Sequence, residues 1–413
     1  MKPVKILILT QYFPPETGAA QNRLSNLAIR LQRKGAEVSI LTAMPNYPQM
    51  KIRDEYRGKC YSREETEGLI IHRAWLYVGT SKSIFPRLLN YFSFVLTSLF
   101  TGWFRLGKFD FIICESPPLF LGISAWCLAK FKGARLVFNV SDLWPESAEK
   151  LGLVTNRFLL KLSTRLEEFL YRNSFLITGQ TRGIVSDISS RFPQKRVHWL
   201  KNGATFTINA EASIQEKQWR IQNGFHEDDF ILLYAGILGH AQGLEVILSA
   251  ADILKTETRI RFILIGSGPM RDQLHAMKEQ MILPNVSFFE TVPRTELLRV
   301  IAEVDAAIIP LKRIELFKGA IPSKIFETLL MKKPMLLGVE GEAKELFIDE
   351  GKAGLAFIPE DAADLASKIL MLYNDPEMAR IAGESGFEYI RKDFNWDNIA
   401  DDLWDKLLPD ISG

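Results

Sequence analysis

The feature that most constrains this chain is the alternation of short apolar runs with helical patterns along its whole length. The runs are rich in Val, Ile, Leu or Phe and lack polar alternation, which is typical of strands buried on both faces of a parallel sheet. Helical stretches lie between them, for example at 22–34 and 156–172. Expected strands in the first half are 4–9, 38–41, 111–114, 136–140 and 175–178.

A polar stretch without strands, 202–216, interrupts the alternation before it restarts. The chain has 413 residues, more than one hydrophobic core usually serves. We therefore expect two doubly wound α/β domains, 1–203 and 204–392, whose ligands bind in a cleft at the carboxyl ends of the strands. The last helix candidate, 396–408, has an apolar stripe that allows 393–413 to pack back on the first domain. Expected strands in the second half are 230–235, 261–265, 286–289, 306–311, 334–339 and 354–358.

Composition excludes several classes of protein. The 51 Lys and Arg residues nearly balance the 49 Asp and Glu residues, so no long-range field attracts nucleic acid. Cys60, Cys114 and Cys127 are far apart, which argues against a disulfide framework and fits a reduced compartment. The histidines form no HExxH motif and no DxD triplet is convincing, so we expect no metal. The apolar run 2–9 is too short for a signal peptide, which predicts a cytoplasmic location.

Two glycine-containing loops follow expected strands of the second half. The first contains Gly236, Gly239, Gln242 and Gly243, and a helix is expected to follow at 244–255. Glycines there allow backbone N–H groups to approach an anion, although an ordinary tight turn explains them equally well.

The second loop contains Gly266 and Gly268, after the expected strand 261–265. A small loop at this place would allow a base or ribose to lie against the backbone. The alternative is a simple turn from strand to helix.

The strongest single segment runs from Pro322 to Glu327. Pro322 and Ser323 are typical of a helix start, which predicts a helix running to about residue 331. Lys324 would place a cation beside free N–H groups, which favours a diphosphate. Glu327 lies one turn further on the side of Ser323, where a carboxylate would accept both hydroxyls of a ribose. The alternative is that Glu327 caps the helix or forms a salt bridge.

Four segments in this order resemble glycosyltransferase family 4, the retaining enzymes of the GT-B fold. They are FPPETGAA at 13–20 followed by Arg23, PNYP at 45–48, DLWPES at 142–147 and PSKIFE at 322–327. The resemblance extends over nearly the whole chain. It is strongest to bacterial transferases of O-antigen and capsule assembly, including the WbuB-like N-acetyl-L-fucosamine transferases.

The resemblance implies two Rossmann-like domains, of which 1–203 binds the acceptor and 204–392 binds a nucleotide sugar. It implies transfer from a UDP-sugar, with retention, to a glycan linked to polyprenyl diphosphate, in O-antigen or capsular polysaccharide biosynthesis. No metal cofactor is needed. The protein would act as a monomer or weak homo-oligomer, bound peripherally to the inner face of the cytoplasmic membrane.

This chain departs from the wider family at two places. The family carries a Glu-x7-Glu pair; Glu327 matches its second member, but Gly319 occupies the first position. The family also has Arg and Lys on the first glycine loop, where this chain has His240 and Gln242. Phosphate charge would therefore rest on Lys324 and backbone N–H groups. In the family the missing Glu contacts the sugar ring. Its loss indicates either an unusual donor, such as an N-acetylated deoxy sugar, or a backbone group that makes the contact instead.

Candidate catalytic residues lie in the first half as well as at Glu327. Asp142 follows the expected strand 136–140, where a carboxylate that positions the acceptor hydroxyl would lie. It would act as a base or only orient the acceptor, and the alternative is that it caps the DLWPES turn. Gly18 would allow the backbone to approach the distal phosphate. Glu115 would line the acceptor side or belong to a structural turn.

The most apolar stretch is 88–104. Its length is at the short limit for a membrane span, and Asn90, Ser93, Thr97 and Thr101 form one polar stripe. These features favour an amphipathic helix at the membrane surface, within 83–108, with basic residues at 82, 87, 105 and 108 near anionic headgroups. The aromatic residues expected to contact lipid are Phe92, Phe100, Trp103 and Phe104. The alternative is a core helix packed on the first sheet.

Two other functions remain open from the residues alone. A UDP-sugar epimerase shares the two-domain plan and would need no lipid surface. A catalytically inactive assembly subunit would explain Gly319 and the altered glycine loop.

Overall fold

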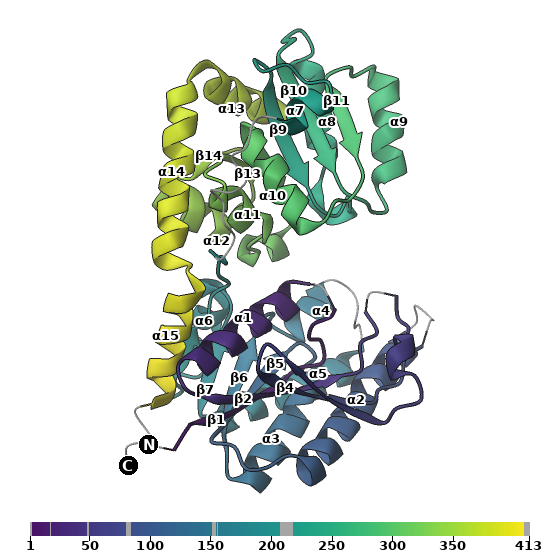
Figure 1. The fold of residues 1–413 in the computed structure, drawn as a ribbon, viewed down its shortest axis with the longest axis vertical. Helices are drawn as coiled ribbons and strands as arrows, with labels where there is room; N and C mark the ends of the chain where they lie inside the picture. Colours follow the sequence, from purple (N-terminus) through teal and green to yellow (C-terminus); the bar gives the residue numbers. More distant parts are fainter. Residues whose placement is uncertain are drawn as a thin grey trace. The chain divides into compact units, whose positions relative to one another are not determined.

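The computed structural model describes residues 2–16, 18–47, 49–79, 84–150, 154, 156–206 and 218–408. The chain divides into two compact units, Met1–Asn202 with Trp396–Gly413, and Gly203–Asn395. Each unit is built around a largely parallel sheet (Figure 1), so the expected α/β fold class is confirmed.

The first unit contains an eight-stranded sheet of order β3-β4-β2-β1-β5-β6-β7-β8. Its paired strands are parallel except that β3 runs antiparallel to β4. The strands are β1 (Lys5–Leu9), β2 (Glu37–Ala43), β3 (Tyr61–Thr66), β4 (Leu69–Ala74), β5 (Phe111–Ser116), β6 (Arg135–Val140), β7 (Leu176–Gly179) and β8 (Val197–Trp199). The helices are α1 (Ala19–Arg33), α2 (Ile84–Arg105), α3 (Leu121–Lys132), α4 (Glu146–Lys150), α5 (Arg157–Asn173), α6 (Arg182–Arg191) and α15 (Trp396–Leu407).

Helices cover both faces of this sheet. α1 and α15 pack on one face, where Leu27 and Leu403 belong to the same buried cluster. α2, α3 and α5 pack on the other face around Phe94, Leu128 and Leu170. The terminal helix α15 thus belongs to the first unit, and an ion pair of 2.8 Å from Arg30 to Asp397 joins it to α1.

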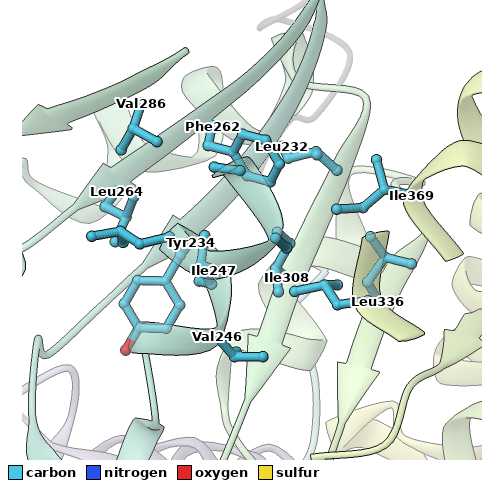
Figure 2. Close-up of a cluster of buried hydrophobic side chains, with 14 of the residues drawn as sticks. Leu232, Tyr234, Val246, Ile247, Phe262, Leu264, Val286, Ile308, Leu336 and Ile369 are labelled. Carbon is cyan, nitrogen blue, oxygen red and sulfur yellow. The ribbon is translucent and has the colours of Figure 1, made fainter. Parts of the chain in front are cut away.

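The second unit contains a six-stranded parallel sheet of order β11-β10-β9-β12-β13-β14. Its core on one face includes Tyr234, Phe262 and Ile369 (Figure 2). The strands are β9 (Phe230–Ala235), β10 (Ile260–Ile265), β11 (Val286–Phe289), β12 (Ala306–Pro310), β13 (Met335–Gly338) and β14 (Gly354–Ala356). The helices are α7 (Gln218–Gln222), α8 (Glu245–Ile253), α9 (Arg271–Met281), α10 (Arg294–Glu303), α11 (Lys324–Leu330), α12 (Glu342–Lys344), α13 (Ala362–Asn374) and α14 (Pro376–Asp393).

Strand order indicates the edge of each sheet at which a ligand is expected. In the first sheet the chain moves outward from β1 to β2 in one direction and from β5 to β6 in the other. In the second sheet the same reversal lies between β9 and β12. Ligands of doubly wound folds bind at the carboxyl ends of strands beside such a reversal. Most candidate residues from the sequence lie on loops that leave these ends.

Candidate functional site

The two glycine loops of the second unit pack directly against each other. Leu238 N–H donates to Ser267 O at 2.9 Å, and Met270 N–H donates to Leu238 O at 2.9 Å. A Cβ at Gly266 would lie 1.9 Å from Gly236 O, and one at Gly268 would lie 2.4 Å from Leu238 O. Both glycines have φ near +150°. Mutual packing therefore requires glycine here, which supports the structural alternative for the second loop.

The first glycine loop ends on a short 3-10 turn, His240–Gln242, followed by Gly243 in the left-handed conformation with φ +60°. Lys312 N–H, after β12, donates to Ala241 O at 2.9 Å. The loop is thus joined to the chain on the other side of the strand reversal. The structure brings Gly236, Gly239, Gln242 and Gly243 to this edge, as the sequence predicts for the loop.

Lys324 extends from α11 to the first glycine loop. A Cβ at Gly236 would lie 2.5 Å from Lys324 Nζ, so the ammonium lies directly against this backbone, whose φ of +142° favours glycine. Nζ donates to the Tyr234 hydroxyl at 3.4 Å and lies 4.7 Å from the ring centroid of Tyr234. That hydroxyl donates to Ile237 O at 2.6 Å. Figure 2 shows it directed away from the labelled apolar side chains.

Burial lowers the pKa of Lys324 to about 8, and the negative charge of Glu327 partly opposes this shift. An ammonium held at the edge of a core is poorly solvated, so it gains more from an incoming anion than an exposed lysine would. The glycine loop, which lacks the family's Arg and Lys, is thus supplied with a cation from α11.

Helix α11 begins where the sequence predicts. Ser323 occupies the N-cap position, but its side chain makes no capping hydrogen bond. The N–H groups of Ile325 and Phe326 donate to Pro322 O and Ser323 O at 3.2 and 3.1 Å. The first turn is therefore partly closed by local bonds, which leaves Lys324 as the main attraction for an anion.

Glu327 forms an ion pair with Arg294, whose Nε donates to Glu327 Oε1 at 2.9 Å. The salt-bridge alternative is thus what this chain adopts without a ligand. Arg294 is the first residue of α10, shortly after β11, at the same edge of the sheet. Sequence reasoning missed it, although its place after an expected strand was a usable signal.

Gly319, at the position of the family's first glutamate, ends a 3-10 turn, Glu315–Gly319. A Cβ built on Gly319 meets no atom within 4 Å. The backbone therefore leaves open space where the wider family places a carboxylate.

A buried ionic cluster occupies the matching edge of the first unit. Arg23 of α1 and Glu115 of β5 form an ion pair in which each side chain is 3% exposed. Arg23 Nη2 also donates to Ser141 Oγ at 2.7 Å, and Asn139 Nδ2 donates to Glu115 Oε2 at 2.5 Å. Thr178 Oγ1 donates to Asn139 Oδ1 at 2.6 Å. Glu115 thus lies in strand β5 and not in a turn, and its carboxylate is held by this buried network.

Asp142 follows this cluster directly and is exposed. Within the described part of the chain its carboxylate has no hydrogen bond or ion pair, so no capping of the DLWPES turn is observed there. Gly18 immediately precedes α1 with extended φ of 167°. Gly18 follows β1, which borders the reversal, and Asp142 follows β6, the second strand from it.

Two of the family segments form one structural unit. Glu16 Oε1 accepts hydrogen bonds from the N–H groups of Asn46 and Tyr47, both at 2.8 Å. Arg73 Nη2 donates to Pro14 O at 2.6 Å. Burial raises the pKa of Glu16, while the two N–H groups act in the opposite direction. The last residue of PNYP, Pro48, lies outside the described residues.

The polar stripe of α2 faces the first unit. Asn90 accepts from Gln11 Nε2 at 2.6 Å and donates to Tyr77 O at 2.7 Å. Ser93 accepts from Tyr77 N–H at 2.8 Å, and Thr97 donates to Trp75 O at 2.5 Å.

The opposite face of α2 exposes large apolar side chains, so the helix packs on the unit and still presents an apolar surface. Position 82 and the side chain of Arg87 lie outside what is described. No described helix is both long and apolar enough to cross a membrane. Among the described residues no group of three or more His, Cys, Asp or Glu is placed to hold a metal.

Comparisons with known proteins agree with this architecture. Residues 18–203 match the family described as Glycosyl transferase 4-like domain, and residues 215–389 match Glycosyl transferases group 1. Sucrose-phosphate synthase from Thermosynechococcus elongatus is similar over 98% of this chain and 99% of that chain, with a TM-score of 0.74 and 17% identity. HepE of Anabaena, solved in complex with UDP-glucose, gives a TM-score of 0.68 at 15% identity over 98% and 99% of the two chains.

Two curated proteins are similar in sequence. The putative colanic acid biosynthesis glycosyl transferase WcaI of Escherichia coli K12 is 27% identical over 99% of this chain and 100% of its own length. The probable glycosyltransferase WbjE of Pseudomonas aeruginosa is 26% identical over 67% and 68% of the two chains.

The fold and the two family matches define the class: a nucleotide-sugar glycosyltransferase of the GT-B plan. Within that class the chain belongs to family 4, as its four segments indicate.

Proposed function

We propose that this enzyme transfers a sugar from a UDP-sugar to a lipid-linked glycan, with retention, during assembly of a surface polysaccharide. In this proposal the unit Gly203–Asn395 binds the nucleotide sugar and the unit Met1–Asn202 binds the acceptor. The observation that carries it is the Lys324 ammonium placed against Gly236 at the strand reversal. The complex of HepE with UDP-glucose supports a UDP-linked donor, and the similarity to WcaI, a putative transferase of colanic acid biosynthesis, supports polysaccharide assembly.

The proposed transfer depends on stabilising the negative charge of the leaving nucleotide diphosphate. The bond between sugar C1 and the diphosphate oxygen breaks, and the acceptor oxygen bonds to C1 on the same face. The acceptor proton passes to the departing phosphate oxygen. Lys324 and the backbone N–H groups of the glycine loop stabilise the negative charge that develops on that oxygen. Asp142 orients the acceptor hydroxyl. Glu327 releases Arg294 and accepts hydrogen bonds from the ribose hydroxyls instead.

The donor sugar is proposed to be an N-acetylated deoxy sugar such as N-acetyl-L-fucosamine. The open space at Gly319 supports this, because a carboxylate contacting the ring hydroxyls of common hexoses is absent there. The acceptor is proposed to be linked to polyprenyl diphosphate, and the exposed face of α2 supports action at the cytoplasmic surface of a membrane. The position of Lys324 argues against a catalytically inactive subunit. Its ammonium lies where it can replace the Arg and Lys that the first glycine loop lacks.

Substitution of the donor-site residues tests the proposal. We expect Lys324→Ala and Glu327→Ala each to lower transfer about 10²–10³-fold, because each removes an interaction with the leaving nucleotide. Lys368→Ala is the control, because Lys368 is 30% exposed on α13 of the same unit and pairs with Asp364 of its own helix. Transfer is measured as UDP release with a lipid-linked acceptor, and UDP affinity by calorimetry. Near-normal transfer in Lys324→Ala, with unchanged UDP affinity, would reject the donor site.

A further inference from the structure

Large exposed apolar side chains are concentrated on three helices of the first unit. Phe104 is 77% exposed on α2, and Phe158 is 74% exposed on α5. A single exposed apolar residue is ordinary, but a group this large on neighbouring helices marks an interaction surface. We call this group the apolar helix face: Leu89, Phe92, Leu96, Phe100, Trp103, Phe104, Phe131, Phe158, Leu159, Leu162 and Phe169.

The face is continuous because α2, α3 and α5 cover the same side of the sheet. α3 contacts both of the other helices. Trp103 of α2 stacks on Phe131 of α3 with ring centroids 3.5 Å apart. On the other flank, Trp126 of α3 meets Phe169 of α5 edge to face at 5.0 Å. The sequence indicated only α2, because α5 reads as an ordinary amphipathic helix whose outer apolar residues would be assigned to the core.

The charges of these helices favour one occupant, an anionic lipid bilayer. α2 and α3 contain no acidic residue. On α5 the two glutamates are already paired, Glu167 with Arg191 and Glu168 with Arg172. The whole chain has a formal net charge of only +2, so this excess is local. The basic residues on these helices and just after α2 include Arg105, Lys108, Lys130, Lys132, Arg157, Lys161 and Arg165, of which Lys132 donates to the backbone of Trp103 and Leu106.

The direction of α5 relates this face to the acceptor edge. α5 follows β6 and α4, so it starts at the carboxyl edge of the sheet and runs back to the start of β7. Phe158, Leu159 and Leu162 therefore lie at the same edge as Asp142. Phe120 also connects the apolar helix face to the DLWPES segment. Its ring centroid lies 4.7 Å from that of Phe92 of α2 and 5.5 Å from that of Trp144.

We propose that α2, α3 and α5 together dock this enzyme on anionic lipid, with the first two turns of α5 holding the Asp142 edge at the membrane surface. A glycan on a lipid carrier then meets Asp142 without leaving the headgroup region. This inference rests on the proposed function and deepens it. It assigns the lipid contact to three helices and directs the sheet edge that carries Asp142 toward the membrane surface.

Vesicle binding of the full chain tests the docking face. Three triple variants are compared: Phe158→Ser/Leu159→Ser/Leu162→Ser on α5, Leu96→Ser/Phe100→Ser/Phe104→Ser on α2, and Ile253→Ser/Ile282→Ser/Ile358→Ser as a control in the second unit. The control residues are similarly exposed, at 54%, 73% and 50%. In sedimentation with phosphatidylcholine–phosphatidylglycerol vesicles, we expect the α5 and α2 variants each to bind about tenfold more weakly than wild type. The control should bind like wild type.

Charge is tested separately with Lys161→Glu/Arg165→Glu. Binding of wild type should be much weaker to pure phosphatidylcholine vesicles and at high salt, and this variant should lose the preference for phosphatidylglycerol. Equal wild-type binding to both vesicle compositions would overturn the choice of an anionic bilayer. A wild-type chain that binds neither composition would assign the face to a protein partner instead.

Normal vesicle binding by the α5 variant would overturn the role of α5 and leave the proposed function intact. Folding of each variant is checked by its melting temperature and by UDP titration. Failure of wild type to bind UDP would instead reject the transferase proposal. An independent measurement uses single tryptophans: emission from Phe158→Trp should be quenched by brominated lipid beyond the wild-type background, and emission from Ile282→Trp should not.

Discussion

Lys324 illustrates how one residue is prepared for an anion. Its ammonium is held between the Tyr234 ring and the Gly236 backbone, and burial lowers its pKa to about 8. In the unfolded chain the same lysine would titrate near its ordinary value of 10.5. The unfolded chain therefore binds more protons between these two values, so this lysine's contribution to stability rises with pH across that window.

The lowered pKa of Lys324 predicts the pH dependence of nucleotide binding. Because the diphosphate requires the charged ammonium, UDP affinity should fall as the pH rises through about 8. Over the same rise, this lysine's contribution to the stability of the unliganded enzyme increases. Calorimetric UDP affinities on both sides of that pH measure the effect. Lys324→Arg stays charged and corrects for titration of the nucleotide itself. The same decline in the arginine variant would show that Lys324 is not the titrating group.

Residue pairings were the least predictable part of the site. The sequence places Lys324, Glu327 and the glycines on loops at the carboxyl edge because each follows a recognisable strand. It gave no indication that Arg294 holds Glu327, because the two residues are 33 positions apart and only the fold joins them. Nor did it indicate that Gly266 and Gly268 are required by the neighbouring loop, since that contact is between backbones.

At the scale of elements, the Arg23–Glu115 pair joins α1 to the ends of β5 and β6. Removing one partner leaves a buried charge without compensation, so we expect Arg23→Met to lower the free energy of unfolding by about 3–5 kcal/mol. The double variant Arg23→Met/Glu115→Met should recover much of that loss, because no unpaired charge remains. Denaturant unfolding of the full chain measures both.

The exposed pair Arg380–Glu377, with side chains 53% and 62% exposed, is the matched control for Arg23→Met. Arg380→Met should leave the free energy of unfolding close to that of wild type, because solvent screens the pair. Equal losses from Arg23→Met and Arg380→Met would contradict the buried cluster.

Strands were predictable where a buried run is apolar throughout; β4 is buried but was missed because His72 and Arg73 interrupt its apolar run. All the runs expected as strands are strands, with ends within about two residues. The missed strands lie toward the borders of the first sheet: β3 and β4 on one side and β8 at the other edge. β3 reads Tyr-Ser-Arg-Glu-Glu-Thr, and an edge strand in contact with water needs no apolar run.

At the scale of the molecule, the sequence predicts two α/β units because apolar runs of one kind recur after an interruption. The apolar stripe of 396–408 also suggests that 393–413 packs on the first domain, and Trp396–Gly413 groups with the first unit. That assignment depends on side-chain matching between α1 and α15, including the Arg30–Asp397 pair.

Two units with separate cores predict a selective response to nucleotide. A ligand that binds only the folded state adds about 2.7 kcal/mol at a concentration of 100 times its dissociation constant. UDP should therefore raise the melting temperature of the unit Gly203–Asn395. Hydrogen exchange of Leu233 and Ile263, in the core of that unit, measures the effect. Exchange of Leu7 and Ile112 in the first sheet serves as the comparison. Greater protection of the first sheet than of the second would place the nucleotide in the wrong unit.

The empty space beside Gly319 has an evolutionary implication. A Cβ built there meets no atom within 4 Å, so a first side-chain carbon displaces no neighbour. In the proposed donor site, selection on the accepted sugar would therefore meet little resistance from packing at this position.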